Sequence, residues 1–151
     1  MFLTRKAWPI STLLPEFRFV RTLQAPDHIV FDKRISRYRI SSQAFRPSSE
    51  DGGLSGDLEQ LLLYDGLSAT AFYPSVKRSI GAASLTVGDV NSLDLSVHHE
   101  PVLNNWYHGA VRGIRSSHSK KLSRLAAELI AIDQSEAARR EAEQTMAALA
   151  R

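Results

Sequence analysis

The end of the chain constrains its fold most, because residues 116–151 contain neither glycine nor proline. This segment is rich in alanine, leucine, glutamate and arginine, the residues with the highest helix propensity. The pattern predicts a C-terminal helix whose first half carries an apolar stripe, at spacings of three and four, that packs on a sheet. The stripe consists of Leu122, Leu125, Ala126, Leu129 and Ile132.

Strand-type sequence precedes this helix. Several segments are rich in aromatic and β-branched side chains, which favour strands. A short helix is expected over 57–64, with Asp57 near its amino end. Strands followed by a terminal helix predict an α+β fold, with a mainly antiparallel sheet covered by the C-terminal helix. The strand-type segments are residues 16–23, 28–32, 36–45 and 81–91.

The length of 151 residues, 43% of them hydrophobic, suits one domain with one core. Prolines interrupt the start of the chain, which predicts an N-terminal arm over 1–16 and a single domain over 17–133. After residue 133 the apolar residues are alanines, Met146 and Leu149. We therefore expect 134–151 to be a helical extension that serves association rather than the core.

Composition excludes several classes of protein. The chain has no cysteine, so it has no disulfide, thiolate nucleophile or cysteine-ligated zinc. No apolar run reaches the ~18 residues that a membrane-spanning helix needs, and charges and prolines interrupt the apolar residues at the start of the chain. The sequence therefore predicts a cytoplasmic protein with no membrane partner, and it indicates no cofactor.

Charge is distributed unevenly along the chain. Residues 1–48 hold nine Lys/Arg against three Asp/Glu, residues 49–108 hold two against eight, and residues 109–151 hold eight against five. Two interpretations are open: the basic and acidic segments pair with one another, or the basic residues of 1–48 contact a polyanion. Arg37 and Arg39 lie two apart on one strand, so we expect both on an exposed face that binds anions.

Residues 94–114 contain three of the five histidines. If residues 100–104 form a hairpin loop, residue pairs whose numbers sum to 204 lie opposite each other. This register places His99 on the core side, and it brings His98 and His108 together beside Trp106. The expected core face holds Leu95, Val97, Tyr107 and Val111, and the expected polar face holds Asp94, Ser96, His98, Trp106, His108 and Arg112.

The polar face suggests two interpretations. A histidine is a suitable general base and Arg112 a suitable anion clamp, so the face carries the ingredients of acid–base chemistry. Cross-strand hydrogen bonds without catalysis explain the same residues, and we favour this structural interpretation. No metal site is expected, because a third ligand beside His98 and His108 would have to be Asp94 or a remote residue, and no HExxH spacing occurs.

The stretches "RISSQAF", "GGLSGD", "VHHEP", "NNWYHGAVRGI" and "KKLSRLAAEL" together resemble a pattern of small bacterial proteins without an assigned activity. The pattern reads Arg-x-Ser-Ser-x-x-Phe, Leu-Ser, His-x-Pro, Asn-x-x-His-Ala, Gly and a closing Ala/Leu helix, and it spans residues 35–129. Gly109 departs from it, since alanine is expected there. The resemblance selects His99 where the alternation of faces selects His98. It implies a bacterial source and a role for Arg39, Ser41, His99, Asn105 and His108.

Three functions remain open on sequence grounds. The leading hypothesis is an accessory or binding protein that contacts a larger protein partner through its basic arm, its arginine-bearing strand and its terminal helix. The second is a small enzyme that acts on a phosphate-containing substrate such as a nucleotide or RNA, with His98 or His108 as general base. The third is a nucleic-acid-binding module that uses residues 1–48.

Overall fold

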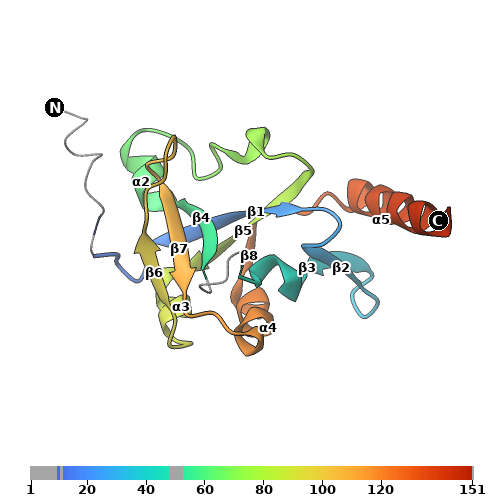
Figure 1. Cartoon of the computed structure of the whole chain (residues 1–151), viewed down its shortest axis with the longest axis horizontal. Helices are drawn as coiled ribbons and strands as arrows, with labels where there is room; N and C mark the ends of the chain where they lie inside the picture. Colours follow the sequence, from blue (N-terminus) through green and yellow to red (C-terminus); the bar gives the residue numbers. More distant parts are fainter. Residues whose placement is uncertain (1–9, 11, 48–52, 151) are drawn as a thin grey trace.

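The structure is a computed structural model that describes residue 10 and residues 12–47 and 53–150. In this part of the chain the main element is a six-stranded antiparallel sheet of strand order β6-β7-β4-β1-β5-β8 (Figure 1). Its presence alongside several helices confirms the predicted α+β fold with a mainly antiparallel sheet. The strands are β1 (Arg18–Gln24), β4 (Leu54–Leu58), β5 (Ser79–Thr86), β6 (Ser96–His99), β7 (His108–Arg112) and β8 (Ala127–Ile130).

One face of this sheet carries the hydrophobic core. Phe19 lies opposite Leu58 in the β1–β4 register, so their side chains share a face, and both are 1% exposed. Strand β4 approaches Phe19 closely at Gly56, where a Cβ would lie 2.4 Å from the Phe19 ring and 2.6 Å from the backbone oxygen of Val20. Only glycine fits there. We call the opposite side the polar sheet face, which contains Ser55, Asp57, Ser96, His98, His108 and Arg112.

Short helices contribute buried residues to the core. They are η1 (Ser42–Phe45), α2 (Glu59–Tyr64), α3 (Val87–Asn91) and α4 (Ser116–Leu125), whereas the short helix η2 (Tyr73–Ser75) has no buried residue. Thr86 begins α3 by accepting a hydrogen bond from the Asp89 backbone N–H at 3.0 Å, a side-chain N-cap. The Ser119 hydroxyl donates to the Phe45 oxygen at 3.0 Å and ties α4 to η1. Asp57, expected in a helix over 57–64, instead belongs to β4, and α2 begins two residues later.

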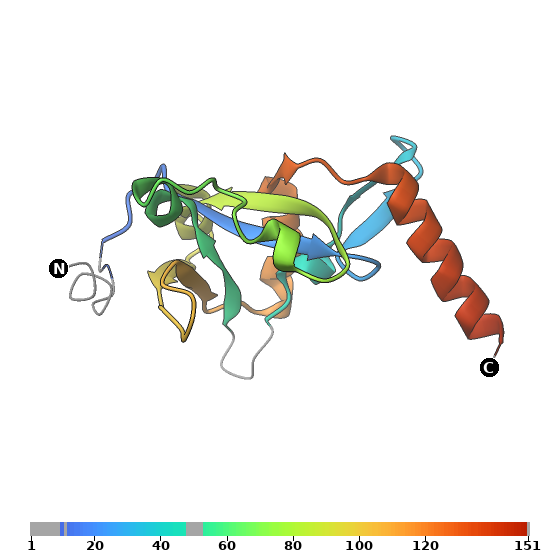
Figure 2. The ribbon, with the colours of Figure 1, turned by 90° about the horizontal axis from the view of Figure 1, so that it is seen from above.

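A separate two-stranded ribbon lies beside the sheet. It pairs β2 (Ile29–Asp32) with β3 (Arg37–Ile40), and the C-terminal helix α5 (Gln134–Leu149) runs next to it. Figures 1 and 2 place α5 at the opposite end of the molecule from the β6–β7 hairpin. The Gln134 side chain bonds both the N–H and the oxygen of Tyr38, and the Tyr38 hydroxyl donates to Glu141. These contacts fix the first turns of α5 on β3.

The continuous helical stripe predicted over 122–132 is wrong, because a strand interrupts it. Helix α4 ends with Leu125, and β8 then pairs antiparallel with β5. The free edge of β5 offers a row of backbone hydrogen bonds, and these outweigh the helix propensity of the local sequence. Leu122 is fully buried as predicted, whereas Leu125 is 40% exposed.

The predicted domain boundaries stay a prediction. The arm over 1–16 falls largely on residues 1–9 and 11, which lie outside the described residues. Helix α5 begins at Gln134, where the C-terminal extension is expected to start. Ala137 is fully buried, so the first turn of α5 packs against the rest of the molecule.

Candidate functional site

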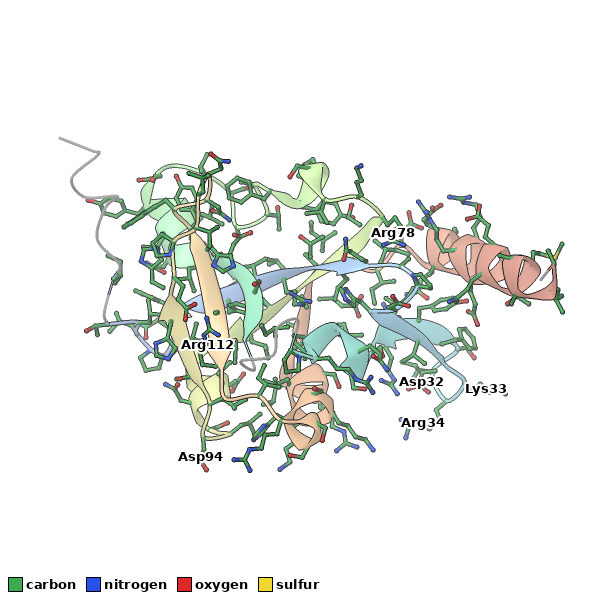
Figure 3. All side chains as sticks on the ribbon, in the orientation of Figure 1. Asp32, Lys33, Arg34, Arg78, Asp94 and Arg112 are labelled. Carbon is green, nitrogen blue, oxygen red and sulfur yellow. The ribbon has the colours of Figure 1, made fainter. Side chains whose placement is uncertain are left out.

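A basic groove lies between the β2–β3 ribbon and α4 in the described structure. Its volume is about 800 Å³. Figure 3 shows Asp32 and Arg34 at the ribbon, well away from Arg112 on β7. The lining that bears on binding consists of Asp32, Arg34, Arg39, Ser41, Ser42, Lys120, Ser123, Arg124 and Glu128, with Val30, Ile40 and Ala126 as its aliphatic part.

The ribbon wall of the groove is an arginine pair around one carboxylate. Asp32 is 8% exposed, and its Oδ1 accepts from the Arg34 backbone N–H at 2.9 Å while Oδ2 accepts from Arg39 Nε at 2.9 Å. Hydrogen bonds from Arg34, with a further one from Arg39, lower the pKa of Asp32. Two guanidinium groups therefore surround a carboxylate that stays ionised, and this wall keeps a net positive charge.

The α4 wall of the groove carries positive charge that, unlike that of the ribbon wall, surrounds no carboxylate. Lys120 and Arg124 lie one helical turn apart, both are exposed, and no acidic side chain pairs with either within residues 12–47 and 53–150. Like charges at this spacing destabilise a helix by a few tenths of a kcal/mol. The positive charge of this wall therefore faces the solvent.

The predicted anion-binding strand lies at the groove. Arg37 and Arg39 share a face of β3 and are 43% and 45% exposed at their side chains, as expected, whereas Tyr38 turns toward α5. Only Arg39 lines the groove. Arg37 Nη2 instead contacts Glu128 Oε1 at 3.2 Å, so Arg37 links the ribbon to β8. Ser41, implied by the resemblance, also lines the groove, and its hydroxyl accepts from the Gln43 N–H at 3.1 Å to begin η1.

The hairpin register differs from the one expected. Residues opposite each other sum to 208 rather than 204, as in His98 opposite Ala110 and Ser96 opposite Arg112. The loop is longer than five residues and contains a bridge between Val102 and Asn105. Because the difference is an even number, side chains keep their faces. The four residues expected on the core face are indeed buried: Leu95, Val97, Tyr107 and Val111.

His98 and His108 lie on the polar sheet face, but each is engaged locally. His98 Nε2 is 2.7 Å from the Ser96 hydroxyl, and His108 Nδ1 is 2.7 Å from the Glu100 backbone oxygen. Arg112 Nε donates to Glu100 Oε2 at 2.9 Å. Hydrogen bonding from Arg112, assisted by the charges of Arg112 and both histidines, lowers the pKa of Glu100. Arg112 is thus paired with a carboxylate of its own hairpin, contrary to the free anion clamp expected.

His99 is a structural residue at the other face. It is 4% exposed, its Nδ1 accepts from the Ile10 N–H at 2.7 Å, and its Nε2 donates to the Trp106 oxygen at 2.6 Å. Burial lowers the pKa of His99, which keeps the ring neutral. The predicted position of Trp106 beside His98 and His108 is wrong. Trp106 lies in the loop, where strand alternation does not apply, and its ring packs perpendicular to the His99 ring with the two centroids 4.5 Å apart.

Asn105 binds the carboxylate of Asp57, a residue that the sequence analysis did not identify as a site candidate. Its Nδ2 donates to Asp57 Oδ1 at 2.8 Å, and its own Oδ1 accepts from the Tyr107 N–H at 3.0 Å. Asp57 lies opposite His108 in the β4–β7 register. Burial raises the pKa of Asp57, although Asn105 and His108 oppose this shift. Local sequence does not predict this pairing, because Asp57 belongs to β4 and Asn105 to the β6–β7 loop, 48 residues further along the chain.

No family model, curated protein or solved structure matches this chain. The residues that the structure describes include no group of three or more His, Asp or Glu able to hold a metal ion. Among the same residues, no helix is long and apolar enough to cross a membrane.

Proposed function

We propose that this protein is a small non-catalytic binding protein, of bacterial origin as the resemblance implies, that takes an acidic segment of a larger protein partner into its basic groove. The observation that carries the proposal is the α4 wall, where Lys120 and Arg124 stand without an acidic partner among the described residues. Arg39 faces them across the groove and keeps 45% of its side chain exposed. Carboxylates of a partner would form ion pairs with these side chains.

The groove suits an acidic peptide better than a nucleic acid. Its lining contains no aromatic side chain on which a base would stack, and it already holds the carboxylates of Asp32 and Glu128. Its aliphatic part, formed by Val30, Ile40 and Ala126, suits the methylene groups of glutamate or a neighbouring apolar residue. A single-stranded nucleic acid would gain no stacking contact from such a lining.

Helix α5 is expected to add to the partner interface. Its outer part is exposed throughout, with Met146 at 68% and Leu149 at 77% exposure. Together with Ala138 and Ala142 these residues follow one another at helical spacings of three and four, so they form one apolar stripe. An apolar stripe on a projecting helix suits a helix-in-groove contact, which agrees with an associative role for this segment.

Fluorescence anisotropy tests the proposal, with a labelled peptide of alternating glutamate and aspartate as the probe. We expect binding that weakens with salt, and at least a tenfold loss of affinity in Lys120→Glu/Arg124→Glu. Lys121→Glu is the matched control, because Lys121 is exposed on α4 but does not line the groove. The proposal is overturned if the double variant binds as the parent does, or if duplex DNA binds more tightly than the peptide with a steep salt dependence.

A further inference from the structure

A second hollow opens on the polar sheet face where β1 and β4 separate. The two strands pair at Phe19 with Leu58 and at Val20 with Asp57. Beyond this point the Arg21 guanidinium bridges the opening, with Nη1 donating to the Ser55 oxygen and Nε to the Ala44 oxygen, both at 2.6 Å. The hollow has a volume of about 250 Å³. It is distinct from the basic groove and shares no lining residue with it.

One side of the hollow presents hydrogen-bond donors. Arg21 lines it, and within residues 12–47 and 53–150 no carboxylate pairs with its guanidinium. Burial lowers the pKa of Arg21 to about 10, so the group is charged at neutral pH while partly removed from water. His28 also lines the hollow, and its Nδ1 accepts from the Gln24 N–H at 2.9 Å. The proton of the neutral His28 ring is therefore on Nε2, which is a donor.

The other side presents acceptors. Asp57 lines the hollow, and Asn105 donates to its Oδ1, whereas Oδ2 accepts no hydrogen bond from residues 12–47 and 53–150. His108 lies opposite Asp57 and also lines the hollow. Because His108 Nδ1 donates to the Glu100 oxygen, its Nε2 is an acceptor when the ring is neutral. Backbone contacts thus fix which nitrogen of each histidine carries the proton.

We infer that this hollow binds a small zwitterion such as an amino acid, with the carboxylate of the ligand on Arg21 and His28 and its ammonium on Asp57 and His108. The pairing follows from the chemistry of the two sides, since guanidinium and imidazole N–H bind carboxylate and since carboxylate and imidazole nitrogen bind ammonium. A volume of about 250 Å³ lies below the usual range for drug-sized ligands, which limits the occupant to a small molecule. Phosphate fits less well, because it would place negative charge against Asp57.

Thermal shift and calorimetry with the intact chain test this inference. The probes are the single L-amino acids at neutral pH, with acetate and ethylamine as the two half-ligands and inorganic phosphate as the competing anion. We expect at least one amino acid to raise the melting temperature and to bind at least tenfold more tightly than either half-ligand. The inference is wrong if no amino acid binds, or if acetate or phosphate binds as tightly as the best amino acid.

Two substitutions locate the binding. Asp57→Asn keeps the shape of the side chain and removes the charge that holds the ammonium, so affinity should fall at least tenfold. His28→Asn keeps an acceptor for the Gln24 N–H but withdraws the ring donor, so affinity should also fall. Asp94→Asn is the matched control, because Asp94 does not line the hollow and Asn tolerates its φ of 60°.

The test of amino-acid binding in the hollow can fail or succeed independently of the test of peptide binding in the basic groove. Lys120→Glu/Arg124→Glu should leave amino-acid binding unchanged, since neither residue lines the hollow. Unchanged amino-acid affinity in a folded Asp57→Asn protein would place the ligand elsewhere and overturn the assignment. If Asp57→Asn does not fold, His28→Asn alone decides in the same way.

Discussion

Two histidines make the stability of the protein depend on pH. Burial, assisted by the charge of Arg21, lowers the pKa of His28 to about 4, and burial also lowers the pKa of His99. In the unfolded chain both rings bind a proton near pH 6.5. Between that pH and the lower folded pKa the unfolded state binds more protons, so the free energy of unfolding falls as pH decreases. Their contribution to stability is present above about pH 6.5.

His28→Asn tests this dependence at one residue. We expect the parent to lose about 1–2 kcal/mol of unfolding free energy between about pH 7 and pH 5, allowing for solvent around the His28 ring. The variant should lose less, because asparagine does not titrate and its amide oxygen can accept from the Gln24 N–H. Urea denaturation at several pH values measures the difference. Equal slopes for parent and variant would contradict the assignment.

At the scale of elements, sequence reasoning succeeded where local pattern decides. Aromatic and β-branched content located β1, β2 and β3, and alternation separated the faces of the β6–β7 hairpin. It failed at β8, where residues of high helix propensity form a strand because β5 offers them an edge. The hairpin register also failed, since the bridge at Val102 and Asn105 is a feature of the loop that alternation does not encode.

Helix α5 divides into an anchoring turn and a free remainder. Gln134 bonds the backbone of Tyr38, and Ala137 is fully buried, whereas every residue from 141 to 149 is exposed. We expect truncation after residue 141, which keeps the hydrogen bond from Tyr38 to Glu141, to change the unfolding free energy by less than about 1 kcal/mol. Truncation after residue 133 should cost about 2–3 kcal/mol, because it also removes the two Gln134 hydrogen bonds and the buried Ala137.

Chemical denaturation of the two truncated proteins measures this contrast. The shorter truncation also removes the exposed Met146 and Leu149, so it tests the associative role of α5 without disturbing the fold. Similar losses of stability in both proteins would show that the outer part of α5 packs on the domain.

At the scale of the whole molecule, the groove explains why site prediction from sequence was partial. Arg39 and Ser41 were selected because they lie in one short motif. Lys120 and Arg124 were not selected, because they lie some eighty residues further along and meet the ribbon only in the folded chain. The same holds for Asp57 of β4 in the second hollow, which lies opposite the predicted residue His108 of β7 only in the folded sheet. A local motif identifies residues on one wall of a site, and only the folded topology brings the residues of both walls together.

The β2–β3 ribbon should be the least protected part of the strand structure. It pairs over four residues and exposes Val30, Phe31 and Ile35, whereas β1 is hydrogen-bonded on both sides within the six-stranded sheet. The Arg37–Glu128 ion pair is one of its links to β8. We expect ribbon amides to exchange through local opening and β1 amides only through global unfolding.

Glu128→Gln tests this link by hydrogen exchange. Glutamine keeps an oxygen for the Ile132 N–H, which Glu128 Oε1 accepts at 2.9 Å, but it removes the charge that attracts Arg37. Because a partly exposed ion pair contributes up to about 1 kcal/mol, ribbon amides should exchange about two- to fivefold faster while β1 amides are unaffected. Glu136→Gln on α5 is the control, since Glu136 pairs with Arg139 and Arg140 of its own helix. Faster exchange throughout the sheet, or none in the ribbon, would show that Arg37 and Glu128 do not hold the ribbon in place.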